Sequence, residues 1–174
     1  AEKWRIFLLS NTNVWDETES WGLRNSPFKY YVNDESTNND VYATAIGCDT
    51  NTGFYPRSPK LTMNSLLADV DLEPTDIVYL DTGNHYMRDT NAPIRWEASD
   101  GGERGQPILI RGSTNAAGSW IVATNRFTEG CFFMEASHMD MRLVNFAGES
   151  IQFLGGDVTV SNMALTNGSM LVRS

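Results

Sequence analysis

Two short stretches of this chain, Met139-Asp140-Met141-Arg142-Leu143 and Val158-Thr159-Val160-Ser161-Asn162, decide how its fold is interpreted. Both alternate apolar and polar residues, and the second follows the first after 19 residues. The same spacing separates three more pairs: Phe146 and Leu165, Met134 and Phe153, and Ser150 and Ser169. Alternation with a period of two is typical of a strand that buries one face. One strand and its turns per repeat predict parallel strands stacked into a coil.

The alternation assigns each side chain of the two stretches to a face of the coil. The apolar members are expected to point inward: Met139, Met141, Leu143, Val158 and Val160. The polar members are expected to form an outward-facing grid: Asp140, Arg142, Thr159 and Ser161. This grid is either solvated surface or a shallow groove for an extended polymer.

The composition of the chain argues against two classes of protein. Its 174 residues include 22 acidic and 13 basic side chains, which gives a formal net charge of −9. Since the Arg and Lys residues are scattered singly, such a chain repels phosphate backbones, and we expect no nucleic-acid partner. Apolar runs such as Ile6 to Leu9 are far shorter than the roughly 20 residues of a membrane-spanning helix. Abundant turn-forming residues favour short strands joined by turns.

The chain divides into two predicted parts. Residues 1–29 contain Trp4, Trp15 and Trp21 without a regular period, which predicts an irregular, aromatic-rich N-terminal arm. Residues 30–174 are expected to form one capped coil, truncated at its C-terminal end.

Three elements are predicted at the start of the coil. Tyr30-Tyr31-Val32 and Ile77–Leu80 are apolar and β-branched or aromatic, which predicts strands. Residues 61–71 predict a short helix that Thr62 caps and that ends before Pro74, because proline cannot continue a helix.

An ordered set of motifs between residues 30 and 86 resembles the opening of right-handed parallel β-helix proteins of the pectate-lyase-like superfamily. In those proteins a segment with the pattern YYV…GxDxNxG…P…P precedes a capping helix and a first strand with the pattern GDxVYVxxGxY. The matching residues are Tyr30-Tyr31-Val32-Asn33-Asp34, then Gly47, Asp49, Asn51 and Gly53, then Pro56 and Pro59-Lys60, then residues 75–86. The chain departs from the pattern at two positions, because Thr75 replaces the glycine and His85 is inserted before Tyr86.

The resemblance implies an all-β fold, a right-handed parallel β-helix or solenoid with a short N-terminal capping helix. It also implies a secreted or cell-surface location, since such segments occur in large secreted and cell-surface bacterial proteins. The superfamily includes polysaccharide lyases, epimerases and many non-catalytic surface or adhesion segments, so the fold alone does not determine the function.

Two loops carry oxygen-bearing side chains at alternate positions, as calcium loops do. The first contains Asp34, Ser36, Asn38 and Asp40, and the second contains Asp49 and Asn51 before Gly53. Ligands at every second position can converge on one Ca²⁺ when the loop curls. Neither loop has the downstream glutamate of an EF-hand. The alternative is a pair of Asx-turns that cap the loops without a metal.

Arg142 and Asp140 are the candidate catalytic residues for an acidic-polysaccharide lyase. Such an enzyme abstracts the proton beside a uronate carboxylate, which requires a base and a cation to neutralise that carboxylate. Arg142 lies on the expected outward face beside Asp140. The position one repeat later is Ser161, so we expect no second basic residue one coil away from Arg142.

Three other signals are interpreted as structural or stay open. Asp81-Thr82-Gly83 resembles the triplet of aspartic proteases, but that chemistry needs two carboxylates sharing one proton. A strand of the coil and its turn already explain the triplet. Cys48 and Cys131 form either a disulfide or two independent thiols, and their surroundings argue against a zinc site. His138 lies in a turn and is expected to be structural.

These patterns predict a non-catalytic extracellular or cell-surface β-helix module with a structural, adhesive or glycan-contacting role. The alternative is a calcium-assisted acidic-polysaccharide lyase or epimerase segment. Residues 170–174 begin another strand, and a coil that ends there exposes an apolar cross-section and an unpaired strand edge. We therefore expect other copies, or further domains of a larger protein, to bind at this open end, and polysaccharide to be the other candidate partner.

Overall fold

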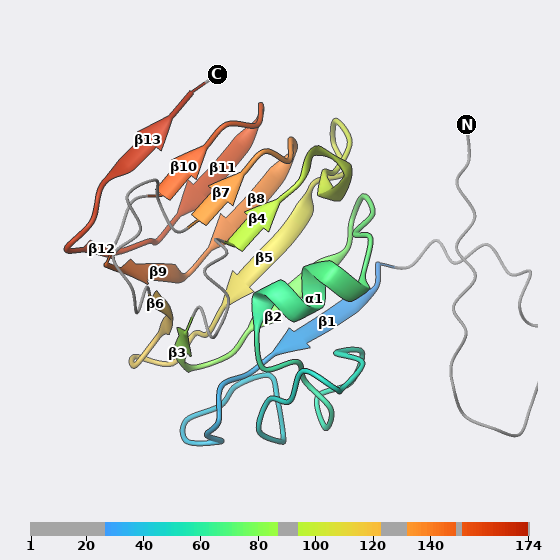
Figure 1. The fold of residues 1–174 in the computed structure, drawn as a ribbon, viewed down its shortest axis with the longest axis vertical. Coiled ribbons are helices and arrows are strands. Elements are labelled where there is room, and N and C mark those ends of the chain that lie inside the picture. Colours follow the sequence, from blue (N-terminus) through green and yellow to red (C-terminus); the bar gives the residue numbers. More distant parts are fainter. Residues whose placement is uncertain (1–26, 87–93, 123–131, 149–150, 174) are drawn as a thin grey trace, which may run out of the picture.

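The computed structural model describes residues 27–86, 94–122, 132–148 and 151–173 (Figure 1). The predicted arm at residues 1–29 falls almost wholly outside the described residues, as do Ser150 and Cys131. The division of the chain at residue 29 therefore stays a prediction.

The described residues form short strands, one α-helix and one short 3-10 helix. The strands are β1 (Lys29–Val32), β2 (Ile77–Leu80), β3 (Gly83–Tyr86), β4 (Ile94–Trp96), β5 (Ile108–Gly112), β6 (Ser119–Val122), β7 (Phe132–Met134), β8 (Met139–Arg142), β9 (Val144–Ala147), β10 (Ile151–Phe153), β11 (Val158–Ser161), β12 (Leu165–Thr166) and β13 (Met170–Val172). The helices are α1 (Met63–Asp69) and η1 (Ala98–Asp100).

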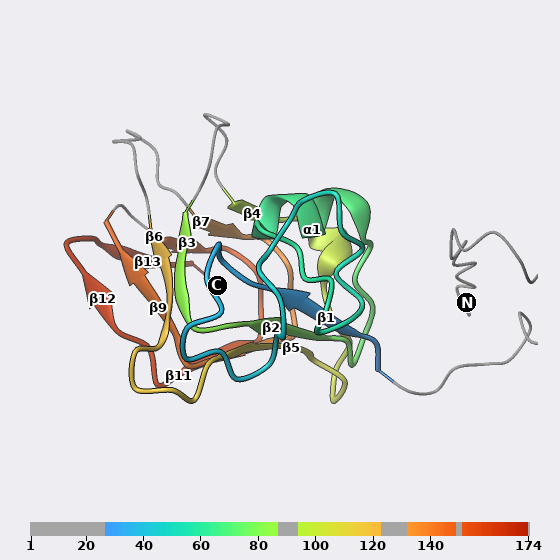
Figure 2. The same cartoon turned by 90° about the horizontal axis from the view of Figure 1, so that it is seen from below.

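The strands form three parallel sheets, here named A, B and C. Sheet A has the order β1-β2-β5-β8-β11, sheet B the order β3-β6-β9-β12, and sheet C the order β4-β7-β10-β13. From β2 onward the chain visits A, B and C in turn, so each passage, here called a rung, stacks on the previous one. Figure 2 shows the sheets on different sides of a common interior. The prediction of a mostly β fold is confirmed.

The 19-residue repeat predicted from the sequence sets the register of the later rungs. Met139 pairs with Val158, Phe146 with Leu165, and Met134 with Phe153. The rung before them is longer. Ile108 on β5 pairs with Met139 on β8, which follows it after 31 residues. The extra residues lie in the connections between strands, where insertions cost little free energy.

Apolar side chains from all three sheets fill the interior. Trp96, Phe132 and Phe146 are almost completely buried, and the ring of Phe132 meets the ring of Phe146 edge to face at a centroid distance of 5.0 Å. Burial of one such side chain contributes roughly 1.5–3 kcal/mol to stability. Met139 and Met141 lie in this core, as predicted.

The predicted inward position of Leu143 is wrong. Leu143 lies between β8 and β9 with a φ of 60°, and it is only half-buried. This left-handed residue turns the chain from sheet A to sheet B, so the next residue, Val144, takes the fully buried position. Val158 and Val160 pack against the core but stay half-buried, because no described rung covers them.

Helix α1 forms where the sequence predicts it and lies beside β4 (Figure 1). The Thr62 hydroxyl accepts a hydrogen bond from the backbone N–H of Ser65 at 3.1 Å, which satisfies one free amide of the first turn. Met63 and Leu66 are buried in the core. The helix therefore closes the interior at the end of the stack that begins with β1.

A tight turn follows the helix and leads into β2. The N–H of Asp76 donates to the carbonyl of Glu73 at 3.0 Å, with Pro74 in the second position of the turn. Thr75, in the third position, has a φ of 76°. This is the arrangement of a type II turn, whose third position favours glycine. Thr75 is also the position at which the related motif has glycine.

The last rung contains β11, β12 and β13, each of which pairs on one side only among the described strands. Met170, Leu171 and Val172 on β13 are 49%, 38% and 63% exposed. Within the same described residues, no helix is long and apolar enough to cross a membrane.

Candidate functional site

The outward face of sheet A carries two rows of side chains in register. The first row contains one residue from each strand: Tyr31, Tyr79, Arg111, Arg142 and Ser161. The second row contains Lys29, Ile77, Leu109, Asp140 and Thr159. Neighbouring strands lie about 4.8 Å apart, so adjacent members of a row are within reach of one another. The predicted outward grid of Asp140, Arg142, Thr159 and Ser161 is thus confirmed as one face of the sheet.

Arg111, Asp140 and Arg142 form a cluster on this face, here called the arginine–aspartate cluster. Arg142 donates from Nε to Asp140 Oδ1 at 2.9 Å and from Nη2 to Oδ2 at 2.6 Å. Arg111 Nη1 approaches Asp140 Oδ1 at 3.5 Å from the neighbouring strand. The Asp140 side chain is only 12% exposed, although it points outward, because the two arginines cover it.

The two guanidiniums determine the protonation of Asp140. Burial alone would raise the pKa of this carboxyl, but hydrogen bonds from Arg142 and Arg111, together with their charges, lower it below its ordinary value. The hydrogen bond with Asp140 in turn raises the pKa of Arg142. Both groups are therefore held in their charged forms, and neither can readily accept a proton from a substrate.

The prediction that no second basic residue lies one coil from Arg142 is wrong. Arg111 pairs directly with Arg142 across β5 and β8. The 19-residue spacing points only to the C-terminal neighbour of Arg142, which is Ser161. On the N-terminal side the spacing is 31 residues, and no repeat in the sequence reveals it.

Aromatic side chains cover the other end of the same face. The ring of Tyr79 stacks on Tyr31 at a centroid distance of 5.4 Å and meets Tyr42 at 4.5 Å. The Tyr42 hydroxyl donates to the carbonyl oxygen of Gly112 at 2.9 Å, which ties the 33–45 loop to β5. Burial, followed by the charge of Tyr79, raises the pKa of Tyr31 and Tyr42. The first row thus has stacked tyrosines on β1 and β2 and charged side chains on the next two strands, β5 and β8.

The first predicted calcium loop is held by hydrogen bonds within the protein. Asp34 Oδ1 accepts the N–H of Ser36 at 2.7 Å, and the Ser36 hydroxyl accepts the N–H of Asn38 at 3.0 Å. Asp34 Oδ2 accepts the N–H of Asn84 on β3 at 3.1 Å. The first two are the contacts of Asx- and ST-turns, the alternative that the sequence left open, and the third joins the loop to β3.

Asp40, the last member of that loop, lies against a buried asparagine. Asn33 Nδ2 donates to Asp40 Oδ2 at 2.7 Å, while Asp40 Oδ1 and Asn33 Oδ1 are buried without a hydrogen-bond partner among the described atoms. Burial, with added repulsion from Asp81 and Asp34, raises the pKa of Asp40 to about 6, although the Asn33 hydrogen bond opposes this. Asp40 therefore changes charge in the mildly acidic range.

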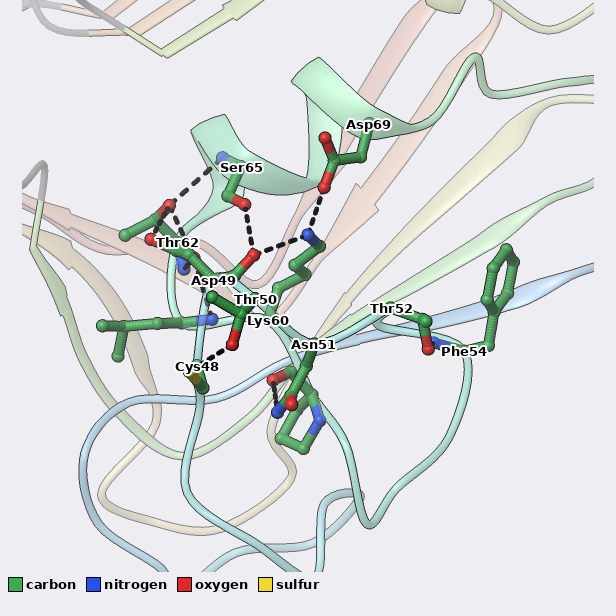
Figure 3. A network of polar contacts seen from close by, with 12 residues as sticks. Cys48, Asp49, Thr50, Asn51, Thr52, Phe54, Lys60, Thr62, Ser65 and Asp69 are labelled. Atoms are coloured by element: carbon green, nitrogen blue, oxygen red, sulfur yellow. Dashed lines mark hydrogen bonds and ion pairs between the residues drawn. The ribbon is translucent and has the colours of Figure 1, made fainter. Parts of the chain in front are cut away.

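The second predicted calcium loop is bonded to the start of α1 and has a buried lysine beside it (Figure 3). The Asp49 carboxylate accepts the N–H groups of Leu61 and Thr62 and the Thr62 hydroxyl. The Lys60 ammonium is buried, donates to the Asp49 carbonyl at 2.8 Å and pairs with Asp69 on α1. Asn51 Nδ2 donates to the Pro59 carbonyl at 2.9 Å. The loop is thereby fastened to the start of the helix.

No group of three or more His, Cys, Asp or Glu side chains in the described ranges is arranged to hold a metal ion. Asp34 and Asp40 lie in one loop, and Asp49 and Asn51 lie in another. The two loops have different hydrogen-bond partners in the protein. Calcium binding at either loop stays a prediction.

Asp81 has a structural environment rather than a catalytic one. Its carboxylate is 1% exposed and accepts four backbone N–H groups, from Val41, Tyr42, Ala43 and Thr82. These hydrogen bonds hold residues 41–43 against the end of β2. These contacts agree with the prediction that the strand and its turn explain the Asp81-Thr82-Gly83 triplet.

The remaining chemically active groups lie apart from the arginine–aspartate cluster. His85 is buried, its Nε2 contacts the Asp81 carbonyl at 2.8 Å, and burial lowers its pKa. His138 lies in the turn before β8 and pairs with Asp157 at 3.2 Å. Cys48 is an exposed thiol, and whether it pairs with Cys131 stays open because Cys131 is outside the described residues.

Comparison of the chain with protein-family models, with curated proteins and with solved structures finds no match. The resemblance to the pectate-lyase-like superfamily accordingly rests on the motifs between residues 30 and 86.

Proposed function

We propose that the chain is part of a right-handed parallel β-helix of the pectate-lyase-like type. Three parallel sheets visited in rotation around an apolar interior support this fold. Right-handed connections between parallel strands are the general rule, which supports the handedness. The motifs of the resemblance fall on β1, the 33–62 loops, α1, β2 and β3, in the order that the family has them.

We propose further that this β-helix is a non-catalytic extracellular or cell-surface module with a structural, adhesive or glycan-contacting role. The observation that carries this proposal is the arginine–aspartate cluster. A general base needs a free lone pair and a pKa near the working pH. Asp140 accepts three hydrogen bonds from two arginines and has a lowered pKa, while the pKa of Arg142 is raised. The best candidate groups thus neutralise each other.

The alternative function is an acidic-polysaccharide lyase or epimerase segment. One observation favours it: Arg111 and Arg142 are adjacent in register on the exposed face of sheet A. Two guanidiniums one strand apart suit a pair of carboxylates on a uronate polymer. For this function a substrate carboxylate would have to replace Asp140 as their partner.

A cleavage assay separates the two functions. The chain is incubated with pectate and with alginate in the presence of calcium, and unsaturated products are followed by ultraviolet absorbance. The non-catalytic proposal predicts no products from the wild type or from Arg142→Ala. Products that disappear in both Arg111→Ala and Arg142→Ala would establish the lyase instead.

We also propose that the last rung binds further copies or further segments of a larger protein. Its support is the apolar strand β13 and the unpaired edges of β11, β12 and β13 among the described residues. Replacing Leu171 or Val172 with Asp is expected to reduce self-association in sedimentation experiments. Equal sedimentation of wild type and variants as monomers would contradict binding between copies.

A further inference from the structure

A small cavity with both polar and apolar lining lies where the 34–36 loop, the start of α1 and strand β3 meet. Its volume is about 160 Å³, and it is partly open to solvent. Two carboxylates, Asp34 and Glu35, line one side, the capping residue Thr62 lies at the helix, and Asn84 and Tyr86 line the β3 side.

The position of Asp34 in this cavity is fixed by the backbone. Its Oδ2 accepts the N–H of Asn84 and its Oδ1 accepts the N–H of Ser36. Gly83 permits this approach, because its φ is 131° and a Cβ there would lie only 2.1 Å from Asp34 Oδ2. Each carboxylate oxygen has a second lone pair, so Asp34 can accept further hydrogen bonds from a ligand without losing its anchors.

The β3 side supplies an aromatic surface. Asn84 and Tyr86 are two residues apart on β3, so both project from the outward face of sheet B, and Tyr86 is 41% exposed. Trp120 on β6 pairs in register with Asn84, and its Nε1 donates to the Ala117 carbonyl at 2.9 Å, which fixes the indole. This contact turns the indole toward residue 117, whereas Tyr86 lies opposite Val122, so Tyr86 is the aromatic side chain that lines the cavity.

We infer that this cavity binds a neutral saccharide, with one sugar ring in the cavity packed against Tyr86. The C–H face of a pyranose ring packs on tyrosine and tryptophan rings, which have an apolar body and a polar tip. The sugar hydroxyls donate to the carboxylates, and Asn84 can both donate and accept. Two carboxylates in the cavity repel a uronate, so among saccharides a neutral one is favoured over an acidic one. This inference rests on the proposed glycan-contacting role and names its ligand class.

Calorimetric titration with oligosaccharides tests the inference. Cellohexaose, mannohexaose and maltohexaose are the neutral probes, and hexagalacturonate is the acidic probe. We expect at least one neutral probe to bind with one-to-one stoichiometry and more tightly than hexagalacturonate. Tyr86→Ala is expected to weaken that binding about tenfold, through loss of the stacked ring.

The chain offers a matched control in Tyr55, which is 42% exposed but does not line the cavity. Tyr55→Ala should leave the affinity unchanged. Glu35→Gln is the second variant, because it keeps the shape of the side chain, and it should weaken binding severalfold. The inference is overturned if no neutral probe binds at millimolar concentration, if Tyr86→Ala and Tyr55→Ala bind equally well, or if hexagalacturonate binds more tightly.

Failure of this inference is distinguishable from failure of the proposed function. The saccharide titration depends on Tyr86 and Glu35, whereas polysaccharide cleavage depends on Arg111 and Arg142. Release of unsaturated products would overturn the non-catalytic proposal whatever the titration shows. Absence of both binding and cleavage would overturn the cavity as a saccharide site and leave a structural role.

Discussion

Thr75→Gly is expected to stabilise the protein. Thr75 occupies the third position of the turn from Glu73 to Asp76 with a φ of 76°, where a β-branched residue is strained. Glycine adopts this conformation without the clash between Cβ and the backbone. It is also the residue that the family motif has at this position.

The size of the effect follows from two opposing contributions. A left-handed conformation costs an L-residue roughly 1–2 kcal/mol, which the substitution removes. Glycine gives the unfolded chain more conformational freedom, which costs about 0.4–1 kcal/mol. The net gain in the free energy of unfolding is therefore about 0.5–1 kcal/mol, or a rise in Tm of about 1–4 °C for a chain of this size.

Urea denaturation followed by circular dichroism measures this difference. Thr159→Gly is the matched control, because Thr159 is exposed in the middle of strand β11 with extended backbone. That change should lower the free energy of unfolding by roughly 0.5–1 kcal/mol. If Thr75→Gly is destabilising by the same amount as the control, Thr75 does not have a positive φ, and the turn assignment is refuted.

Three other changes test separate parts of the structure. Asp40 has its pKa raised to about 6, so the folded state binds the proton more tightly than the unfolded state, and the free energy of unfolding falls as the pH rises from about 4 to 6. Asp40→Asn should remove that fall and raise the free energy of unfolding by about 1 kcal/mol at pH 7.5, after allowance for solvent screening. If urea denaturation shows the same pH dependence for the variant as for the wild type, the environment assigned to Asp40 is contradicted. Asp81→Asn should lower the free energy of unfolding by about 3 kcal/mol. Each carboxylate oxygen of Asp81 accepts two backbone N–H groups, and in asparagine the amide nitrogen would point its own N–H groups at one of these pairs. Asp157→Asn, at an exposed carboxylate, is the control and should change stability by less than about 0.5 kcal/mol. Gly112→Ala should lower the Tm by several degrees, because a Cβ there would lie 1.9 Å from the carbonyl oxygen of Leu143; normal stability would show that Gly112 and Leu143 are further apart.

The regular part of the coil could be predicted from the sequence, because its rungs repeat every 19 residues. Strands β8 and β11 and the pairings of Phe146 with Leu165 and of Met134 with Phe153 follow from alternation and spacing alone. Helix α1 could be predicted from its cap and from Pro74. The left-handed turn at Leu143 could not be predicted from the sequence, because it is required only where the chain passes from sheet A to sheet B after β8.

The candidate site was predictable only in part. The pairing of Asp140 with Arg142 follows from their two-residue separation on one face of a strand. Arg111 joins them through a 31-residue rung, and the connections between strands that lengthen this rung have no sequence periodicity. The cavity at Tyr86 depends on the approach of Asp34 to Gly83, a contact between a loop and strand β3 that no local pattern predicts.

The most direct test of the central claim is a long incubation of the chain with pectate and alginate in the presence of calcium, with the products analysed by ultraviolet absorbance and by size. The paired charges of Arg111, Asp140 and Arg142 predict polymers of unchanged length and no unsaturated ends. Shortened, unsaturated products that vanish in Arg111→Ala and Arg142→Ala would contradict the account, because they would mean that the cluster opens to act on a substrate.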